Sequence, residues 1–236
     1  MLLFLNELTD NPQAFMVYLA AFATAILTGL AFHEFSHAWS ANELGDDTAK
    51  RQGRLTLNPL VHLDPLGTAL LLLVGFGWAK PTPVNPWRLR VGPIRGNAIV
   101  AFAGPASNFF FAALAALPIR IGIVETNVAE GPRETLLEAV IARGGGEDYL
   151  YLFLLFVISL NVLLGVFNLI PIPPLDGFKV LGGFLPREAA HQLQRLEPYG
   201  PGILMVLFMI GFVNPALSPL GWIVGLAYDD VLSFFV

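Results

Sequence analysis

The chain has 236 residues, of which 55% are hydrophobic and only 13% are charged, and its mean hydropathy is +0.65. This composition lies outside the range of soluble globular proteins and predicts an all-α polytopic membrane protein with about four to six transmembrane helices. The net charge of −5 is small and dispersed, so no nucleic-acid partner is expected, and the lack of cysteine excludes disulfides and thiolate metal ligands.

The first long uncharged run, residues 11–32, can cross the hydrocarbon core of a bilayer, which is roughly 30 Å thick. The helix can continue to Leu44, because Gly45 is a suitable residue to end it. The following loop, residues 46–64, contains Lys and Arg, whereas nothing before residue 11 is basic. By the positive-inside rule, we expect the N-terminus outside and this loop in the cytoplasm.

The inner end of this helix carries the motif AFHEFSH, which ends at His37. In a helix, His33 and His37 lie one turn apart on one face, as two imidazole ligands of one divalent metal would. Glu34 points to an adjacent sector, where it can act as the general base for water without binding the metal. The alternative is a pair of core histidines, which we disfavour because ionisable residues inside a membrane usually mark function.

The next apolar stretch, residues 65–79, is short for a spanning helix and has basic residues on both sides. We therefore expect a re-entrant or β-hairpin segment near residues 65–95, with a thin transmembrane helix as the alternative. Irregular backbone at membrane depth is stable only where it is buried in protein or lines a water-filled cavity.

Two further spans are predicted after this segment. Residues 96–119 form one of them and contain Asn108 within the motif GPASN. Residues 149–175 form the other, and a cluster of prolines breaks its end just before Asp176. The intervening loop, residues 120–148, is net acidic and is expected outside the membrane.

The last part of the chain is harder to assign. Residues 185–197 are charged and amphipathic, and we expect them on the inner surface with His191 in solvent. Residues 198–228 are uncharged, and we expect C-terminal membrane segments over residues 198–236. They are either one span with an interfacial helix or a hairpin of two helices.

Two histidines leave a catalytic zinc site one protein ligand short, and a carboxylate commonly completes it. Asp176 is the best candidate, because an unpaired charge at the end of an apolar run would be costly. Asp176 lies on the same side of the membrane as the histidines only if the chain crosses an even number of times between them. The two later spans supply two crossings, so residues 65–79 must make none or a pair. His62 and Asp64 are rival ligands, although hydrogen bonding or helix capping is their favoured role.

Asn108 is a second polar residue of interest within the apolar spans. Its amide could donate a hydrogen bond to the oxyanion that forms when a peptide carbonyl is attacked. Polar residues also join helices to one another in membranes. The sequence favours neither role over the other.

Five segments stand out in order along the chain: HEFSH from His33, GRLTLNPLVHLDPLGT from Gly53, WAKPTPVNP from Trp78, GPASN from Gly104 and NLIPIPPLDG from Asn168. Together they resemble the site-2 protease family of intramembrane zinc metalloproteases, peptidase family M50. The resemblance covers roughly residues 20–180, and it is to a minimal member without the PDZ or CBS domains of many relatives.

The resemblance implies a single intramembrane metalloprotease domain over residues 1–236, with a catalytic core at about 11–180 and C-terminal membrane segments at 198–236. It implies that Glu34 is the base and that Asn108 helps to hold substrate or the oxyanion. It also implies three ligands of Zn²⁺: His33, His37 and Asp176.

The family further implies that residues 75–84 hold an extended substrate, and that the protein hydrolyses single-span membrane proteins within or near their transmembrane segments in regulated intramembrane proteolysis. We expect an integral protein of a prokaryotic inner membrane, with its site towards the cytoplasmic side. The alternatives are a membrane metal-ion transporter and a metal-binding scaffold. Because ion transport needs no general base, Glu34 separates the protease from the transporter. The sequence does not predict the oligomeric state.

Overall fold

A computed structural model describes residues 12–74, 77–124 and 145–235. Helices dominate these residues, and the only β pairing among them is one isolated bridge. Four helical stretches are long and apolar enough to cross a membrane: Phe15–Glu43, Pro93–Arg120, Gly146–Asn168 and Arg187–Val213. The predicted all-α polytopic membrane architecture is confirmed. Most of the loop at 120–148 lies outside the described residues.

The N-terminal span runs without a break through α2 (Pro12–Thr24), a π-helical turn η2 (Ala25–Gly29) and α3 (Leu30–Glu43). A π turn adds a residue to the helical turn and is frequent at functional sites. Here it directly precedes the helix that carries the HEFSH motif. The helix ends at the predicted place, because Gly45 adopts a φ of 104° that a residue with a side chain would rarely tolerate.

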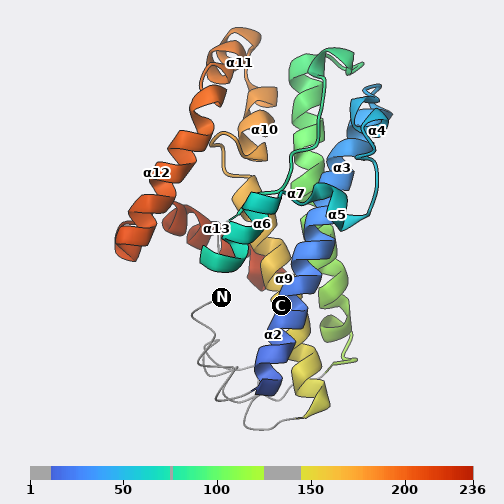
Figure 1. Ribbon diagram of the computed structural model, residues 1–236, viewed down its shortest axis with the longest axis vertical. Coiled ribbons are helices and arrows are strands. Elements are labelled where there is room, and N and C mark those ends of the chain that lie inside the picture. Colours follow the sequence, from blue (N-terminus) through green and yellow to red (C-terminus); the bar gives the residue numbers. More distant parts are fainter. Residues whose placement is uncertain (1–11, 75–76, 125–144, 236) are drawn as a thin grey trace.

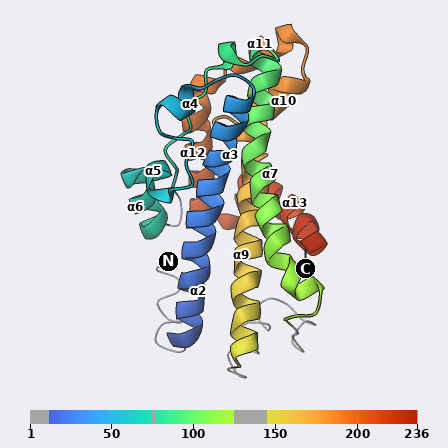
Figure 2. The ribbon, with the colours of Figure 1, turned by 90° about the vertical axis from the view of Figure 1, so that its right-hand side faces the viewer.

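The centre of the fold is a bundle of long helices that lie side by side (Figures 1 and 2). Helix α7 (Pro93–Arg120) packs against α3 and against α9 (Gly146–Asn168), and α9 also packs against α2. These are the two further spans that the sequence predicts. Part of the core lies between α7, α9 and the C-terminal helix, and its buried residues are Ala112, Ala116, Ile158, Val162, Val166, Leu232 and Phe235.

The segment between the first two spans is re-entrant. It contains the short helices α4 (Thr48–Arg51), α5 (Pro59–His62) and α6 (Pro65–Val74). Leu63 and Ala79 then pair in an antiparallel bridge, so the chain leaves this region beside the point where it entered. The segment therefore makes no net crossing, as the placement of Asp176 requires, and the described residues form a helical excursion rather than a β-hairpin.

The C-terminal part returns over the bundle. Helix α11 (Arg187–Gln194) is the predicted amphipathic surface helix, and His191 on it is exposed. The residues after it form a pair of helices, α12 (Gly200–Val213) and α13 (Pro219–Phe235), of which α13 packs against α9. Helix α12 lies within the candidate span Arg187–Val213, whereas α13, over its described residues, is not part of a candidate span. The elements are α10 (Asp176–Phe184), α11 (Arg187–Gln194), η4 (Glu197–Tyr199), α12 (Gly200–Val213), η5 (Pro215–Leu217) and α13 (Pro219–Phe235).

Candidate metal centre

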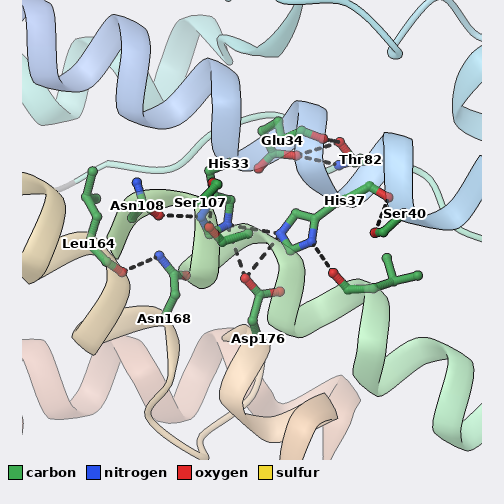
Figure 3. Close-up of polar contacts among 12 residues, drawn as sticks. His33, Glu34, His37, Ser40, Thr82, Ser107, Asn108, Leu164, Asn168 and Asp176 are labelled. Atoms are coloured by element: carbon green, nitrogen blue, oxygen red, sulfur yellow. Dashed lines mark hydrogen bonds and ion pairs between the residues drawn. The ribbon is translucent and has the colours of Figure 1, made fainter. Parts of the chain in front are cut away.

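Three predicted ligands meet in the interior of the helix bundle (Figure 3). His33 Nε2 and His37 Nε2, on adjacent turns of α3, lie 3.0 Å apart. Asp176 Oδ2 lies 3.1 Å from the first of these nitrogens and 3.2 Å from the second. All three residues are buried. Residues 143 positions apart along the chain thus present their donor atoms to one point, because the start of α10 returns to α3.

The return of α10 depends on how α9 ends. Helix α9 stops at Asn168, and the proline-rich turn that follows leads directly into Asp176, the first residue of α10. Gly177 lets the two backbones come close, since a Cβ at this position would lie only 2.0 Å from the carbonyl oxygen of Leu169. Asp176 is thus held at a helix start rather than in an unwound segment.

Hydrogen bonds on the far side of each imidazole determine which ring nitrogen faces the centre. His33 Nδ1 contacts Asn108 Oδ1 at 2.7 Å, and His37 Nδ1 contacts the carbonyl oxygen of Val100 at 2.7 Å. Both partners can only accept, so both Nδ1 atoms donate their proton. The neutral rings therefore turn the lone pairs of their Nε2 atoms towards Asp176, as metal-binding histidines do.

A second asparagine fixes the orientation of the first. Asn108 Nδ2 donates to Gly29 O at 3.2 Å and to Asn161 Oδ1 at 3.3 Å, which leaves its Oδ1 for His33. Asn161 in turn donates from Nδ2 to Val157 O at 2.9 Å. Both asparagines are fully buried. The oxyanion role of Asn108 stays a prediction, and these contacts give it a positioning role towards His33.

Asn161 is not among the sequence-predicted residues, although a signal for it exists. It interrupts the apolar run VISLNVLLGV, and the argument applied to Asn108 applies equally to a polar residue there. The two asparagines are neighbours only because α7 packs on α9. Sequence reasoning identified one half of this pair.

The donor set fits a zinc ion. Two neutral imidazoles and one carboxylate are a known ligand set of catalytic zinc, in which a fourth position stays open. Zn–N bonds of about 2.0–2.1 Å in a tetrahedron place ligand atoms about 3.3 Å apart, close to the separations found here. Asp176 would bind the ion as the ionised carboxylate.

Space for the ion is provided by a glycine of α7. A Cβ on Gly104 would lie 2.4 Å from His37 Nε2 and 2.6 Å from His33 Nε2. These distances mean that any side chain at this position would occupy volume next to both nitrogen donors. The glycine of the GPASN motif therefore keeps that volume open.

Glu34 lies beside the metal group without joining it. Its Oε2 accepts hydrogen bonds from the backbone N–H of Thr82 at 3.0 Å and from the Thr82 hydroxyl at 2.7 Å. The other carboxylate oxygen points away from Thr82 (Figure 3). Glu34 and the metal group line one cavity of about 620 Å³, which also reaches Trp78 and the α11–α12 region.

The rival ligands take the roles that the sequence favours for them. His62 Nε2 donates to the carbonyl oxygen of Thr56 at 2.8 Å. Asp64 Oδ1 accepts from the backbone N–H of Gly67 at 2.8 Å and so caps the start of α6. Within the described residues, neither belongs to the metal group.

Comparison with known proteins agrees with this geometry. Residues 21–211 match the model of peptidase family M50. The chain belongs to this family. It is 37% identical over 95% of its length to a protein of Bacillus subtilis (strain 168) named "Putative zinc metalloprotease YwhC", and covers 93% of that protein. It is 32% identical over 93% of its length to "Putative zinc metalloprotease Rip2" of Mycolicibacterium smegmatis, of which it covers 76%. No solved structure matches it. This M50 peptidase is an integral membrane zinc metalloprotease.

The asparagine pair predicts a graded loss of zinc affinity in this M50 peptidase. Asn108→Leu removes the acceptor that orients His33, and we expect zinc to bind about 10–100-fold more weakly, as measured by competition with a chelator. Asn161→Leu acts one contact further away and should have a smaller effect in the same direction. Asn97→Leu, which changes another asparagine of α7, is the control. Equal affinities for Asn108→Leu and the control would contradict the positioning role.

Proposed function

We propose that this M50 peptidase hydrolyses peptide bonds within or near the transmembrane segments of single-span membrane proteins, in regulated intramembrane proteolysis. The observation that carries the proposal is the place of the site. The carboxylate of Glu34 and the metal group of α3 and α10 line one cavity in a bundle of membrane-length helices. A peptide bond cut there must come from a segment that enters the membrane.

In this proposal, His33, His37 and Asp176 hold the zinc ion. Bound zinc would act as a Lewis acid and lower the pKa of water to about 7. Glu34 is the general base, which takes the proton of the attacking water and delivers it to the leaving amine. Because Oε2 is occupied by Thr82, the other oxygen of Glu34 handles the proton.

The substrate must lose its helical structure before it can react, since a helix keeps its amides in hydrogen bonds. The cavity beside Glu34 is lined by both apolar and polar groups, among them Trp78, Leu204 and Lys179. The bound segment would be surrounded by protein here rather than by lipid. Polar groups along it can therefore be satisfied at a depth where lipid would leave them unpaired.

We also propose that the site faces the cytoplasm from a prokaryotic inner membrane. Helices α4 and α11 lie at one end of the molecule (Figure 1) and carry Lys50, Arg51 and Arg187. An excess of basic residues marks the cytoplasmic side of membrane proteins. His33 and His37 lie in the half of their span that is nearer to this end.

The proposal is tested with purified wild type, Glu34→Gln and Glu43→Gln on a panel of single-span membrane proteins. We expect cleavage by wild type, a loss of about 10²–10⁴-fold in Glu34→Gln because the base is gone, and equal bound zinc in all samples. Glu43 is exposed at the end of the same helix and is the control for the loss of a carboxylate. Zinc-loaded wild type that cuts no member of a broad panel would contradict the proposal and favour a transporter or scaffold.

A further inference from the structure

Thr82 holds the side chain of Glu34, the base of the proposed reaction. Thr82 donates two hydrogen bonds to Glu34 Oε2, one from its backbone N–H and one from its hydroxyl, and the hydroxyl oxygen lies 3.2 Å from the backbone oxygen of Glu34. These contacts join residues that are 48 positions apart in the sequence. Two donors on one oxygen fix the side-chain rotamer of a carboxylate, which would otherwise sample several positions in a cavity.

The backbone around Thr82 is itself held by the protein. The N–H of Lys80 donates to the carbonyl oxygen of His62 at 2.8 Å. Pro81 and Pro83 have no N–H, and the N–H of Thr82 is engaged by Glu34. In residues 80–83, each backbone N–H therefore either donates a hydrogen bond within the protein or is absent because the residue is proline.

The carbonyl groups of the same stretch are held by a buried cation. Arg54 is 4% exposed, and its guanidinium donates to the carbonyl oxygens of Val61, Lys80 and Pro81. It thereby joins the loop before α5 to the stretch that contains Thr82. The resemblance implies that residues 75–84 pair with an extended substrate, of which 75–76 lie outside the described residues. Pairing with a substrate strand needs free backbone groups, but the N–H groups of Lys80 and Thr82 and the carbonyl oxygens of residues 80–81 are already hydrogen-bonded within the protein.

We propose that residues 80–82 form a clamp on the general base and that Thr82 is the positioning residue of this clamp. The inference rests on the proposed function. By holding Oε2, the clamp presents the other oxygen of Glu34 to water in the cavity. The geometry also explains why the clamp lies on a stretch with two prolines: the stiff backbone keeps the Thr82 donors in place without help from a strand partner.

A pair of substitutions separates this role from a structural one. Thr82→Val keeps the β-branched shape and the backbone N–H but removes the hydroxyl. Thr82→Ser restores the hydroxyl. With a substrate that wild type cleaves, we expect Thr82→Val to lower kcat by about 10–100-fold, with KM within about twofold and unchanged bound zinc, because a misplaced catalytic group costs rate rather than binding. Thr82→Ser should return kcat to within about threefold of wild type.

Two controls complete the experiment. Thr56→Val makes the same chemical change in a neighbouring loop and should keep the wild-type kcat. Thr82→Val added to Glu34→Gln should cause no further loss, because the group that the clamp positions is already gone.

Three results would overturn the inference: an unchanged kcat in Thr82→Val, equal losses in Thr82→Val and Thr82→Ser, or a loss of zinc in Thr82→Val that parallels the loss of rate. Failure of the proposed function is a different result, because wild type itself would then cut nothing.

Discussion

Gly104→Ala is expected to abolish zinc binding while the helices stay folded. The added Cβ would lie 2.4 Å from His37 Nε2 and 2.6 Å from His33 Nε2, against normal carbon–nitrogen contacts of about 3.5 Å. The rings are held from behind by Asn108 and by the backbone of Val100, so they cannot move aside without losing these hydrogen bonds. In α7 itself, alanine is a better helix former than glycine by about 1 kcal/mol. The substitution therefore disrupts the metal site without destabilising the helix.

Metal content after purification measures this effect directly. We expect less than about 0.1 zinc per Gly104→Ala chain and a loss of all zinc-dependent cleavage, consistent with a ligand sphere that the methyl group distorts. Gly202→Ala is the matched control, because it makes the same change inside helix α12 at a position where a Cβ meets nothing within 4 Å. Full zinc occupancy in Gly104→Ala would mean that the ion is bound away from the three predicted ligands.

The parts of the site that the sequence reveals are those with a local pattern. The spacing of His33 and His37 is a property of one helix, and the cost of a lone charge in an apolar run singles out Asp176. The number of membrane crossings gives a further constraint, because Asp176 reaches the histidines only if residues 65–79 make no net crossing. The bridge between Leu63 and Ala79 shows that the chain returns to the point where it entered. Local spacing, charge and crossing parity together predicted the residues that the structure brings together.

The remaining parts depend on packing between distant segments and leave no local pattern. Thr82 lies in a proline-rich stretch where threonine is unremarkable, and its contact with Glu34 exists only because the re-entrant segment folds against α3. In the sequence Arg54 looks like one of several basic residues of a polar loop, yet it is buried. For residues 65–79, a short apolar run does not distinguish a helix from a hairpin. Helix α6 shows that the described part of this run is helical, and the bridge between Leu63 and Ala79 shows that it makes no net crossing.

Arg54→Met is expected to destabilise the protein more than the loss of any surface charge. Arg54 is the donor to three carbonyl oxygens, one in α5 and two in residues 80–81, and methionine fills a similar volume but donates to none of them. Hydrogen bonds to a charged group contribute about 1.5–3 kcal/mol each, and partial exposure of these carbonyls reduces that value. We expect the free energy of unfolding to fall by about 3 kcal/mol, which would lower Tm by roughly 6–12 °C in detergent.

Two comparisons give this prediction its specificity. Arg51→Met removes an exposed guanidinium that pairs with Asp47 at 2.6 Å, and such surface pairs contribute about 0–1 kcal/mol. Arg54→Lys keeps the charge without the planar fork and should fall between wild type and Arg54→Met. Because Arg54 holds the stretch that contains Thr82, kcat should fall in the same order at temperatures where all variants are folded. A Tm of Arg54→Met equal to that of Arg51→Met would show that water replaces the guanidinium, and the clamp would then need no support from this loop.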